Sequence, residues 1–107
     1  MRFAAALAVL LVAACGLKQP QEQREKRTVQ SWAASLALAG DAWTRGELPK
    51  HFVRNAAEAA VEELTKSAKG HDAARVIALG HQLEDAVERD DRAAAARIAI
   101  DLEEVSR

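Results

Sequence analysis

Histidine is the side chain best suited to proton transfer near neutral pH and to metal binding, and this sequence has three, His51, His71 and His81. Their spacing favours neither chemistry, because none of them stands three or four positions from another histidine on a shared helix. His81 and Glu84 reverse the Glu-x-x-His order with which di-iron bundles place two ligands in a core, and the pair occurs once. We therefore expect three solvated histidines, with no metal and no cofactor.

Nucleophiles and paired acids are no better placed. No serine lies in a Gly-x-Ser-x-Gly turn. Adjacent carboxylates such as Glu62 and Glu63 point away from each other on a helix, so they suit a solvated surface better than an acid–base couple. Covalent haem attachment would need a Cys-x-x-Cys-His sequence, but the chain has one cysteine. The sequence therefore predicts a protein that is not an enzyme.

Trp32, Trp43 and Phe52 are the remaining side chains that could build a site, in this case an apolar one. In an alanine-rich chain these aromatic residues should supply much of the core volume. Held between helices, they would also line a pocket for a small apolar or metal-containing ligand. Such a ligand-binding module is the alternative to the leading hypothesis given below.

The elements that must position these residues are helices. From about Pro20 onward the chain is rich in alanine, glutamate and arginine and lacks strand-like alternation, which predicts an all-α fold. Helix boundaries are marked by proline in a first turn, glycine just past an end and aspartate as an N-cap. These signals stand at Pro20, Gly46, Pro49, Gly70, Asp72, and Asp90 or Asp91.

We predict helices at about residues 20–45, 49–69, 72–89 and 91–106. Short connections make sequential helices antiparallel, so they should form a small antiparallel bundle. The last boundary has two interpretations, because residues 88–92 contain two aspartates that favour a turn but no glycine or proline. The last two segments are either separate helices or one long helix, which would make a three-helix assembly with a protruding end.

Apolar residues recur at helical spacing and predict the buried face of each segment. The stripes are Val29, Trp32, Leu36, Ala39 and Trp43; Phe52, Val53, Ala56, Ala57, Ala60, Val61 and Leu64; Ala73, Val76, Ile77, Leu79, Gly80, Leu83, Ala86 and Val87; and Ala94, Ile98, Leu102 and Val105. Leu38 and Ile100 fall outside these stripes. They are either singly exposed apolar residues, which are common, or parts of a contact surface for another protein or a second copy.

The N-terminal segment carries the sharpest functional signal. Arg2 precedes an apolar run over residues 3–14, roughly a dozen residues. This is the length of a signal-peptide core and well short of the ~20 residues that span a bilayer as a helix. The segment is therefore predicted to be a cleaved signal peptide.

The apolar run ends in Val12-Ala13-Ala14-Cys15, which resembles the lipobox of bacterial lipoproteins. The resemblance implies that a signal peptidase recognises Val12, Ala13 and Ala14, that cleavage occurs before Cys15, and that the cysteine thiol carries a diacylglyceryl group. Gly16 occupies the position at which an aspartate would favour the inner membrane. The resemblance therefore implies the periplasmic face of the outer membrane, with the inner membrane as the alternative. An uncleaved signal anchor and a non-lipidated secretory signal are the other interpretations of this segment.

Processing would divide the chain into a signal peptide (residues 1–14), a lipidated cysteine with a short tether (residues 15–21) and a helical bundle (residues 22–107). The fully extended tether reaches no more than ~20 Å, so the bundle should act close to its own membrane. Loss of Arg2 leaves 14 basic against 16 acidic residues. Such a balance lacks the positive charge typical of nucleic-acid-binding domains and of polybasic lipid-binding segments, so we expect no nucleic-acid partner.

The leading hypothesis is a non-enzymatic lipoprotein that is anchored to membrane lipid through acylated Cys15. Its helical faces would bind an envelope protein or a second copy of the chain. An inhibitor or immunity-type partner of a secreted enzyme is a weaker variant that the residues do not separate from this hypothesis.

Overall fold

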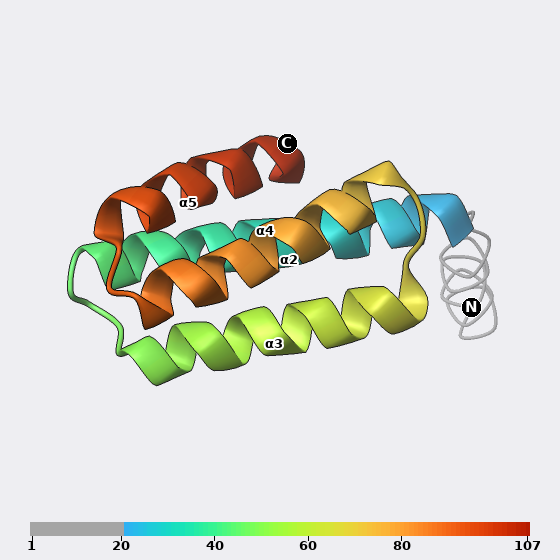
Figure 1. Ribbon diagram of the computed structural model, residues 1–107. Coiled ribbons are helices and arrows are strands. Elements are labelled where there is room, and N and C mark those ends of the chain that lie inside the picture. Colours follow the sequence, from blue (N-terminus) through green and yellow to red (C-terminus); the bar gives the residue numbers. More distant parts are fainter. Residues whose placement is uncertain (1–20) are drawn as a thin grey trace, which may run out of the picture.

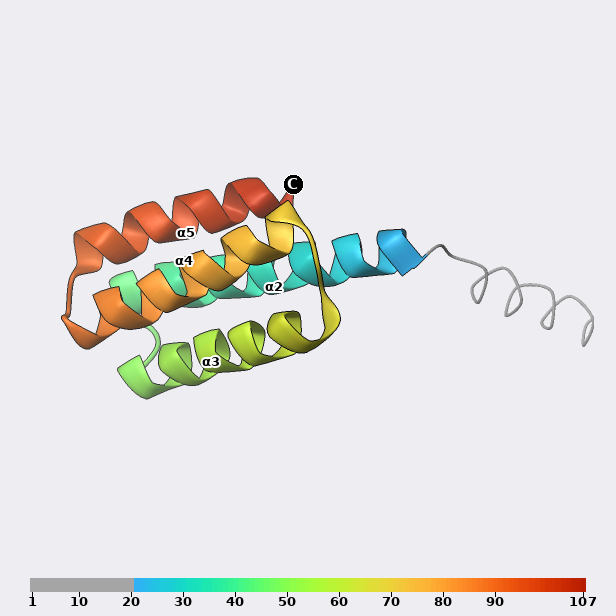
Figure 2. The same ribbon diagram turned by 45° about the vertical axis from the view of Figure 1, so that its right-hand side comes forward.

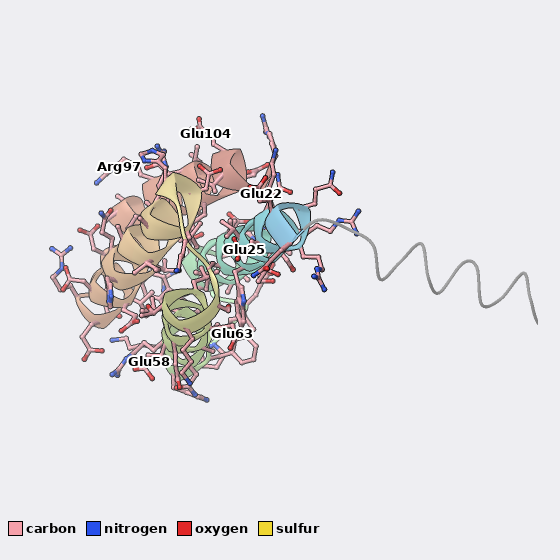
Figure 3. All side chains as sticks on the ribbon, turned by 90° about the vertical axis from the view of Figure 1, so that its right-hand side faces the viewer. Glu22, Glu25, Glu58, Glu63, Arg97 and Glu104 are labelled. Carbon is pink, nitrogen blue, oxygen red and sulfur yellow. The ribbon has the colours of Figure 1, made fainter. Side chains whose placement is uncertain are left out.

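The computed structural model describes residues 21–107, and these residues form four helices and no strand. The helices are α2 (Gln21–Thr44), α3 (Lys50–Ser67), α4 (His71–Glu88) and α5 (Arg92–Ser106). Each runs antiparallel to the helix before it, and α5 closes the ring beside α2 (Figure 1). Viewed along the bundle, α2 and α4 occupy opposite corners, with α5 and α3 at the two corners between them (Figure 3). The predicted all-α antiparallel bundle is confirmed, in its four-helix form.

The predicted signal peptide and the lipobox residues Val12, Ala13, Ala14 and Cys15 lie outside the described residues, so their assignments stay predictions. Gln21, the last residue of the predicted tether (residues 15–21), is the first residue of α2. The first turns of this helix extend beyond the C-terminal end of α5 (Figures 1 and 2). The projecting end of α2 is its N-terminal end, next to the predicted tether.

A Schellman arrangement ends α2 at the predicted glycine. The Gly46 N–H donates to the Trp43 carbonyl at 2.9 Å, and the Glu47 N–H donates to the Ala42 carbonyl at 2.8 Å. Gly46 has a φ of 74°, in the left-handed region where a residue with a Cβ is strained. The two hydrogen bonds satisfy the carbonyls of Ala42 and Trp43, which have no partner within the helix. The chain turns here, and α3 begins at Lys50.

The same arrangement separates α4 from α5 without a glycine. Asp90 takes the left-handed conformation, with a φ of 55°, and its N–H donates to the Val87 carbonyl at 3.1 Å. The Asp91 N–H donates to the Ala86 carbonyl at 2.8 Å, and the Asp91 carboxylate accepts from the Ala94 N–H at 3.0 Å. Aspartate tolerates the left-handed region better than most residues because its short polar side chain can bond locally. The two aspartates therefore end one helix and begin the next.

Replacing Asp91 by alanine should lower the free energy of unfolding by about 1 kcal/mol, because the Ala94 N–H loses its acceptor at the start of α5. The neighbouring variant Asp90→Gly is the control. Glycine adopts the left-handed conformation without strain, which should offset the loss of the exposed ion pair between Asp90 and Lys50, so this variant should change the stability by less than about 0.5 kcal/mol. Urea denaturation followed by circular dichroism measures both. Equal losses in the two variants would contradict the capping role of Asp91.

Two predicted helix starts are shifted by a residue or more. Gly70, not Asp72, is the N-cap of α4, with a φ of 103° that favours glycine, and Asp72 lies in the first turn. There its carboxylate still interacts favourably with the positive end of the helix dipole. Pro49 is the N-cap of α3, one position before the first turn.

The core lies between the four helices and is built from leucine, valine and alanine. Its largest fully buried side chains are Leu36, Leu64, Leu83, Leu102, Val53, Val76 and Val87, all of them in the predicted stripes. Gly40 and Gly80 lie in helix interiors at close approaches. A Cβ on Gly80 would lie 3.0 Å from Val61 Cγ2, and one on Gly40 would lie 3.2 Å from Leu83 Cδ1. Small residues therefore let the helices pack at short distance.

The predicted contribution of Phe52 to the core is wrong. Its side chain is 52% exposed, whereas that of the next residue, Val53, is fully buried. Successive residues on a helix are rotated by about 100°, so the two cannot face the same direction. The predicted stripe of the second helix was too wide: the buried residues are Val53, Ala57, Ala60 and Leu64. Trp43 is buried as expected, and Trp32 is half-buried.

Candidate contact surface

A groove runs between the outer faces of α2 and α5. Its floor contains four alanines, Ala34 and Ala37 from α2 and Ala96 and Ala99 from α5. Because these side chains are short, they leave a hollow of about 570 Å³ between the two helices. Leu38 and Ile100, the two residues outside the predicted stripes, line the same hollow. They are 72% and 58% exposed.

A second hollow, of about 520 Å³, adjoins the first along α2. It lies where α2 turns into α3, and its apolar lining includes Leu48 and Phe52. Leu38 lines this hollow as well as the first, so it forms the ridge between them. Phe52 therefore lies outside the core and is exposed beside Leu38 of the neighbouring helix α2.

Ile100, Leu38 and Phe52 are the exposed large hydrophobic residues of the bundle from residue 21 to residue 107. They belong to three neighbouring helices, α5, α2 and α3, and the shared hollows place them in that order across one surface. We call this surface, formed by Ile100, Leu38, Phe52 and the alanines between them, the Leu38 face. Single exposed apolar residues are ordinary, whereas three that converge on one surface make a candidate contact site.

Charged residues border the Leu38 face. Arg45 lies between two carboxylates, with Nη1 2.8 Å from Asp41 Oδ2 and Nη2 3.1 Å from Glu47 Oε2. Asp41 and Glu103 line the first hollow, and Arg45 and Glu47 line the second. These side chains are more than half exposed, so each ion pair contributes less than ~1 kcal/mol to stability. The border of the Leu38 face is of mixed sign, with more acidic than basic groups.

The three aromatic residues predicted to line a ligand pocket do not converge. Phe52 lines the second hollow, while Trp32 and Trp43 line none of the larger hollows in the part of the chain that is described. Trp43 packs in the core, where the Arg92 guanidinium lies 5.5 Å from the centroid of its ring. Arg92 also donates to the Thr44 carbonyl at 3.0 Å, so it closes the end of the bundle over Trp43. The tryptophans serve the packing of the bundle.

The histidines stand apart. His51, His71 and His81 are all exposed, on α3 and α4. Within residues 21–107, no three His, Cys, Asp or Glu side chains gather as they would around a metal ion.

The ammonium of Lys66 donates to Glu62 at 3.0 Å, and this hydrogen bond, together with the negative charge of the carboxylate, raises the pKa of Lys66. The amine is therefore held in its protonated form rather than tuned toward a neutral-pH base.

None of the described helices is both long enough and apolar enough to cross a bilayer. Comparison of the chain with protein-family models, curated proteins and solved structures finds no match. The candidate site consequently rests on the geometry of the Leu38 face.

Of the predicted site residues, the structure brings together Leu38 and Ile100 and adds Phe52 to them. Sequence reasoning missed the exposed position of Phe52 because it was assigned to the buried stripe. The available signal was its angular offset from Val53, Ala57 and Leu64, which places it at the edge of the apolar arc. Pairing of Leu38 with Ile100 depends on α5 packing beside α2, and helical periodicity does not contain that information.

Proposed function

We propose that this chain is a lipid-anchored lipoprotein of the bacterial outer membrane that acts in the periplasm without catalysis, by binding a protein through the Leu38 face. The observation that carries the binding role is the convergence of Ile100, Leu38 and Phe52 on one surface. An apolar surface bordered by mixed charges is typical of a protein contact, because apolar area supplies the affinity and the charged border supplies the orientation. The lipobox-like residues carry the localisation.

The anchor and the contact surface are parts of one arrangement. Cys15 precedes the first residue of α2 by six positions, which limits their separation to ~20 Å. Two or three acyl chains on one cysteine hold a protein on a membrane stably, since each buried methylene contributes about 0.8 kcal/mol. Leu38 stands on the same helix that follows the tether. The proposed partner is therefore a component of the same envelope layer, or a second copy of the chain.

Substitution of Cys15 by alanine should abolish lipid attachment, because the thiol is the proposed acceptor of the diacylglyceryl group. Cells that express the full chain are grown with a labelled fatty acid, and the protein is then followed through membrane fractionation. The original protein should be labelled and should sediment with the membranes, and Cys15→Ala should carry no label. Equal labelling of the two proteins would contradict the anchor.

The contact surface is tested separately in intact cells, with a photoreactive residue in place of Leu38. The control carries the same residue in place of Ala78, which is exposed on α4, at the opposite corner of the bundle. Crosslinked species from position 38 but not from position 78 are the expected result. Equal yields at the two positions, or none at either, would contradict binding through the Leu38 face.

A further inference from the structure

We infer that the turn between α4 and α5 is a hinge, and that its opening lets two copies of the chain exchange α5 and form a domain-swapped dimer. The turn lies at the end of the bundle opposite the projecting end of α2 (Figure 1). In the exchanged form, residues 71–106 make one straight helix, and α5 of each copy packs in the place that α5 of the other has left. Neither the proposed anchor nor the proposed contact surface is needed for this exchange.

The backbone of two residues reverses the chain in this turn. Arg89, with φ −85° and ψ 2°, stays close to the helical region. Asp90, with a φ of 55°, and Asp91, with φ −91° and ψ 87°, depart from it. Aspartate accepts the left-handed conformation more readily than most residues, but unlike glycine it does so at a cost in free energy. Rotation of these two residues into the helical region would therefore relieve strain and continue α4 into α5.

The residues of the turn are compatible with a helix. Residues 88–92 contain neither glycine nor proline, whereas the other two turns of the described bundle contain Gly46 and Gly70. In a straight helix Glu88 would stand four positions before Arg92, which is the order and spacing that stabilise a helix. Residues 88–90 are exposed, so straightening the turn takes no apolar side chain of these residues out of the core.

The side-chain contacts that hold the turn closed are weak. Lys50 Nζ lies 3.1 Å from Asp90 Oδ1, and Arg54 Nη1 lies 3.0 Å from Glu88 Oε2. All four side chains are more than a third exposed, so solvent screens both ion pairs. These contacts with α3 bias the turn toward its closed form without locking it.

Backbone hydrogen bonds do not oppose the opening. In the closed form the Asp91 carboxylate accepts from the Ala94 N–H at the start of α5. In a straight helix the carbonyl four residues earlier, that of Asp90, would accept from the same N–H. The first amides of α5, which have no acceptor within that helix, would likewise find carbonyls in α4. Short strained turns of this kind favour exchange between copies.

The packing of α5 is kept in the exchanged form. This helix packs on α2 and α4 and buries Ala95, Ile98, Ala99 and Leu102. α5 runs antiparallel to α4 in the bundle (Figure 1). A two-fold axis perpendicular to the straight helix therefore presents the empty place of the second copy in the direction that α5 requires. Because the same core contacts form in both arrangements, the turn and the protein concentration decide the balance.

Exchange also changes how the Leu38 face is built. Ile100 belongs to α5, whereas Leu38 and Phe52 belong to α2 and α3. An exchanged dimer would carry two such faces, each with Ile100 from one chain and the other two residues from its partner. A target with two matching sites would bind this dimer more tightly than it binds the monomer.

Substitutions in the turn should shift the balance in opposite directions. The double variant Asp90→Ala with Asp91→Ala removes the residue that tolerates the left-handed conformation and the N-cap, and alanine favours a helix. Each change acts in both chains of a dimer, so the dissociation constant of the dimer should fall at least about a hundredfold. Asp90→Gly relieves strain in the closed turn and weakens a straight helix, so it should raise that constant at least about tenfold.

The full chain, extracted in detergent, is unfolded in urea and refolded over a range of protein concentrations, because α5 must leave its own bundle before it can exchange. Sedimentation measures the fraction of dimer, and circular dichroism checks the helical fold. If the double variant loses helicity, Asp90→Ala alone keeps the Asp91 cap and should still lower the dissociation constant at least about tenfold. Alanine variants that dimerise no more than Asp90→Gly would overturn the hinge.

A crosslink distinguishes exchange from the association of two intact bundles. Gln30 Nε2 donates to the Arg107 carbonyl at 3.3 Å, so this pair joins α2 to the end of α5. Chains with Gln30→Cys and chains with Arg107→Cys, both carrying the two alanines in the turn, are refolded together and treated with a bismaleimide. Exchange should give a covalent heterodimer, and chains without introduced cysteines control for the Cys15 thiol. Dimers that give no such crosslink would overturn the exchange of α5.

Discussion

Leu36→Ala should lower the free energy of unfolding by about 2–5 kcal/mol, whereas Leu38→Ala, two positions later on the same helix, should change it by less than about 0.5 kcal/mol. The two substitutions remove the same atoms. Leu36 is fully buried among the four helices, and Leu38 is 72% exposed. The first variant leaves a cavity in the core, and the second removes atoms that already contact water. The difference follows from helical geometry, which turns the two side chains about 200° apart.

Urea denaturation at low protein concentration measures both changes. A low concentration is needed because association through Leu38 would add apparent stability to the original protein. The unfolding slope with denaturant should be similar in all three proteins, since the fold is retained. Equal destabilisation by the two variants would show that α2 is rotated relative to the arrangement described above, and it would contradict the Leu38 face as well as the core.

Trp43→Ala should cost about 3–5 kcal/mol, which would make it one of the most destabilising single substitutions in this bundle. The ring is 5% exposed, and the Arg92 guanidinium lies 5.5 Å from its centroid. Alanine therefore leaves a large cavity and also removes a cation–π contact, which contributes ~0.5–1 kcal/mol at partly exposed sites. The loss falls at the end of the bundle where α2 approaches the start of α5, so these helices should separate there first.

The matched control for Trp43 is Phe52, which is also aromatic but is 52% exposed. Phe52→Ala should cost less than about 1 kcal/mol, because about half of the side-chain surface is already in contact with water. Thermal unfolding followed by circular dichroism avoids dependence on tryptophan emission. A Trp43→Ala protein as stable as Phe52→Ala would contradict the placement of the two aromatic side chains.

Much of the fold follows from local signals in the sequence. The helical class and most of the helix ends were predictable, because residues such as Gly46 and Asp91 act through short-range conformational preferences and hydrogen bonds. The separation of α4 from α5 was left with two interpretations. Its resolution depends on Asp90 in a left-handed conformation, which aspartate adopts less readily than glycine.

The contact surface was predictable only in part. Leu38 and Ile100 could be identified as residues outside the apolar stripes, but their meeting in one groove depends on which helices are neighbours. Phe52 was misplaced because a stripe drawn on one helix does not show how wide the partner's contact is. In this alanine-rich bundle α3 buries a narrow arc, and the residue at the edge of that arc turns to the surface.

α2 combines two tasks in the proposed function. Its first residue follows the tether, and its middle carries the leucine ridge to which α5 and α3 each add one exposed apolar residue. A single rigid helix would therefore fix the height and orientation of the contact surface above the membrane. The bundle behind it supplies the packing that keeps α2 straight and correctly rotated.

The measurement that tests this account most directly is the mass of the protein extracted from the membranes of cells that express the full chain. The account predicts a polypeptide that begins at Cys15 and carries a diacylglyceryl group on the cysteine thiol, with the added mass confined to the N-terminal peptide. Recovery of a chain that keeps residues 1–14, or of a cleaved chain whose Cys15 bears no lipid, would contradict it.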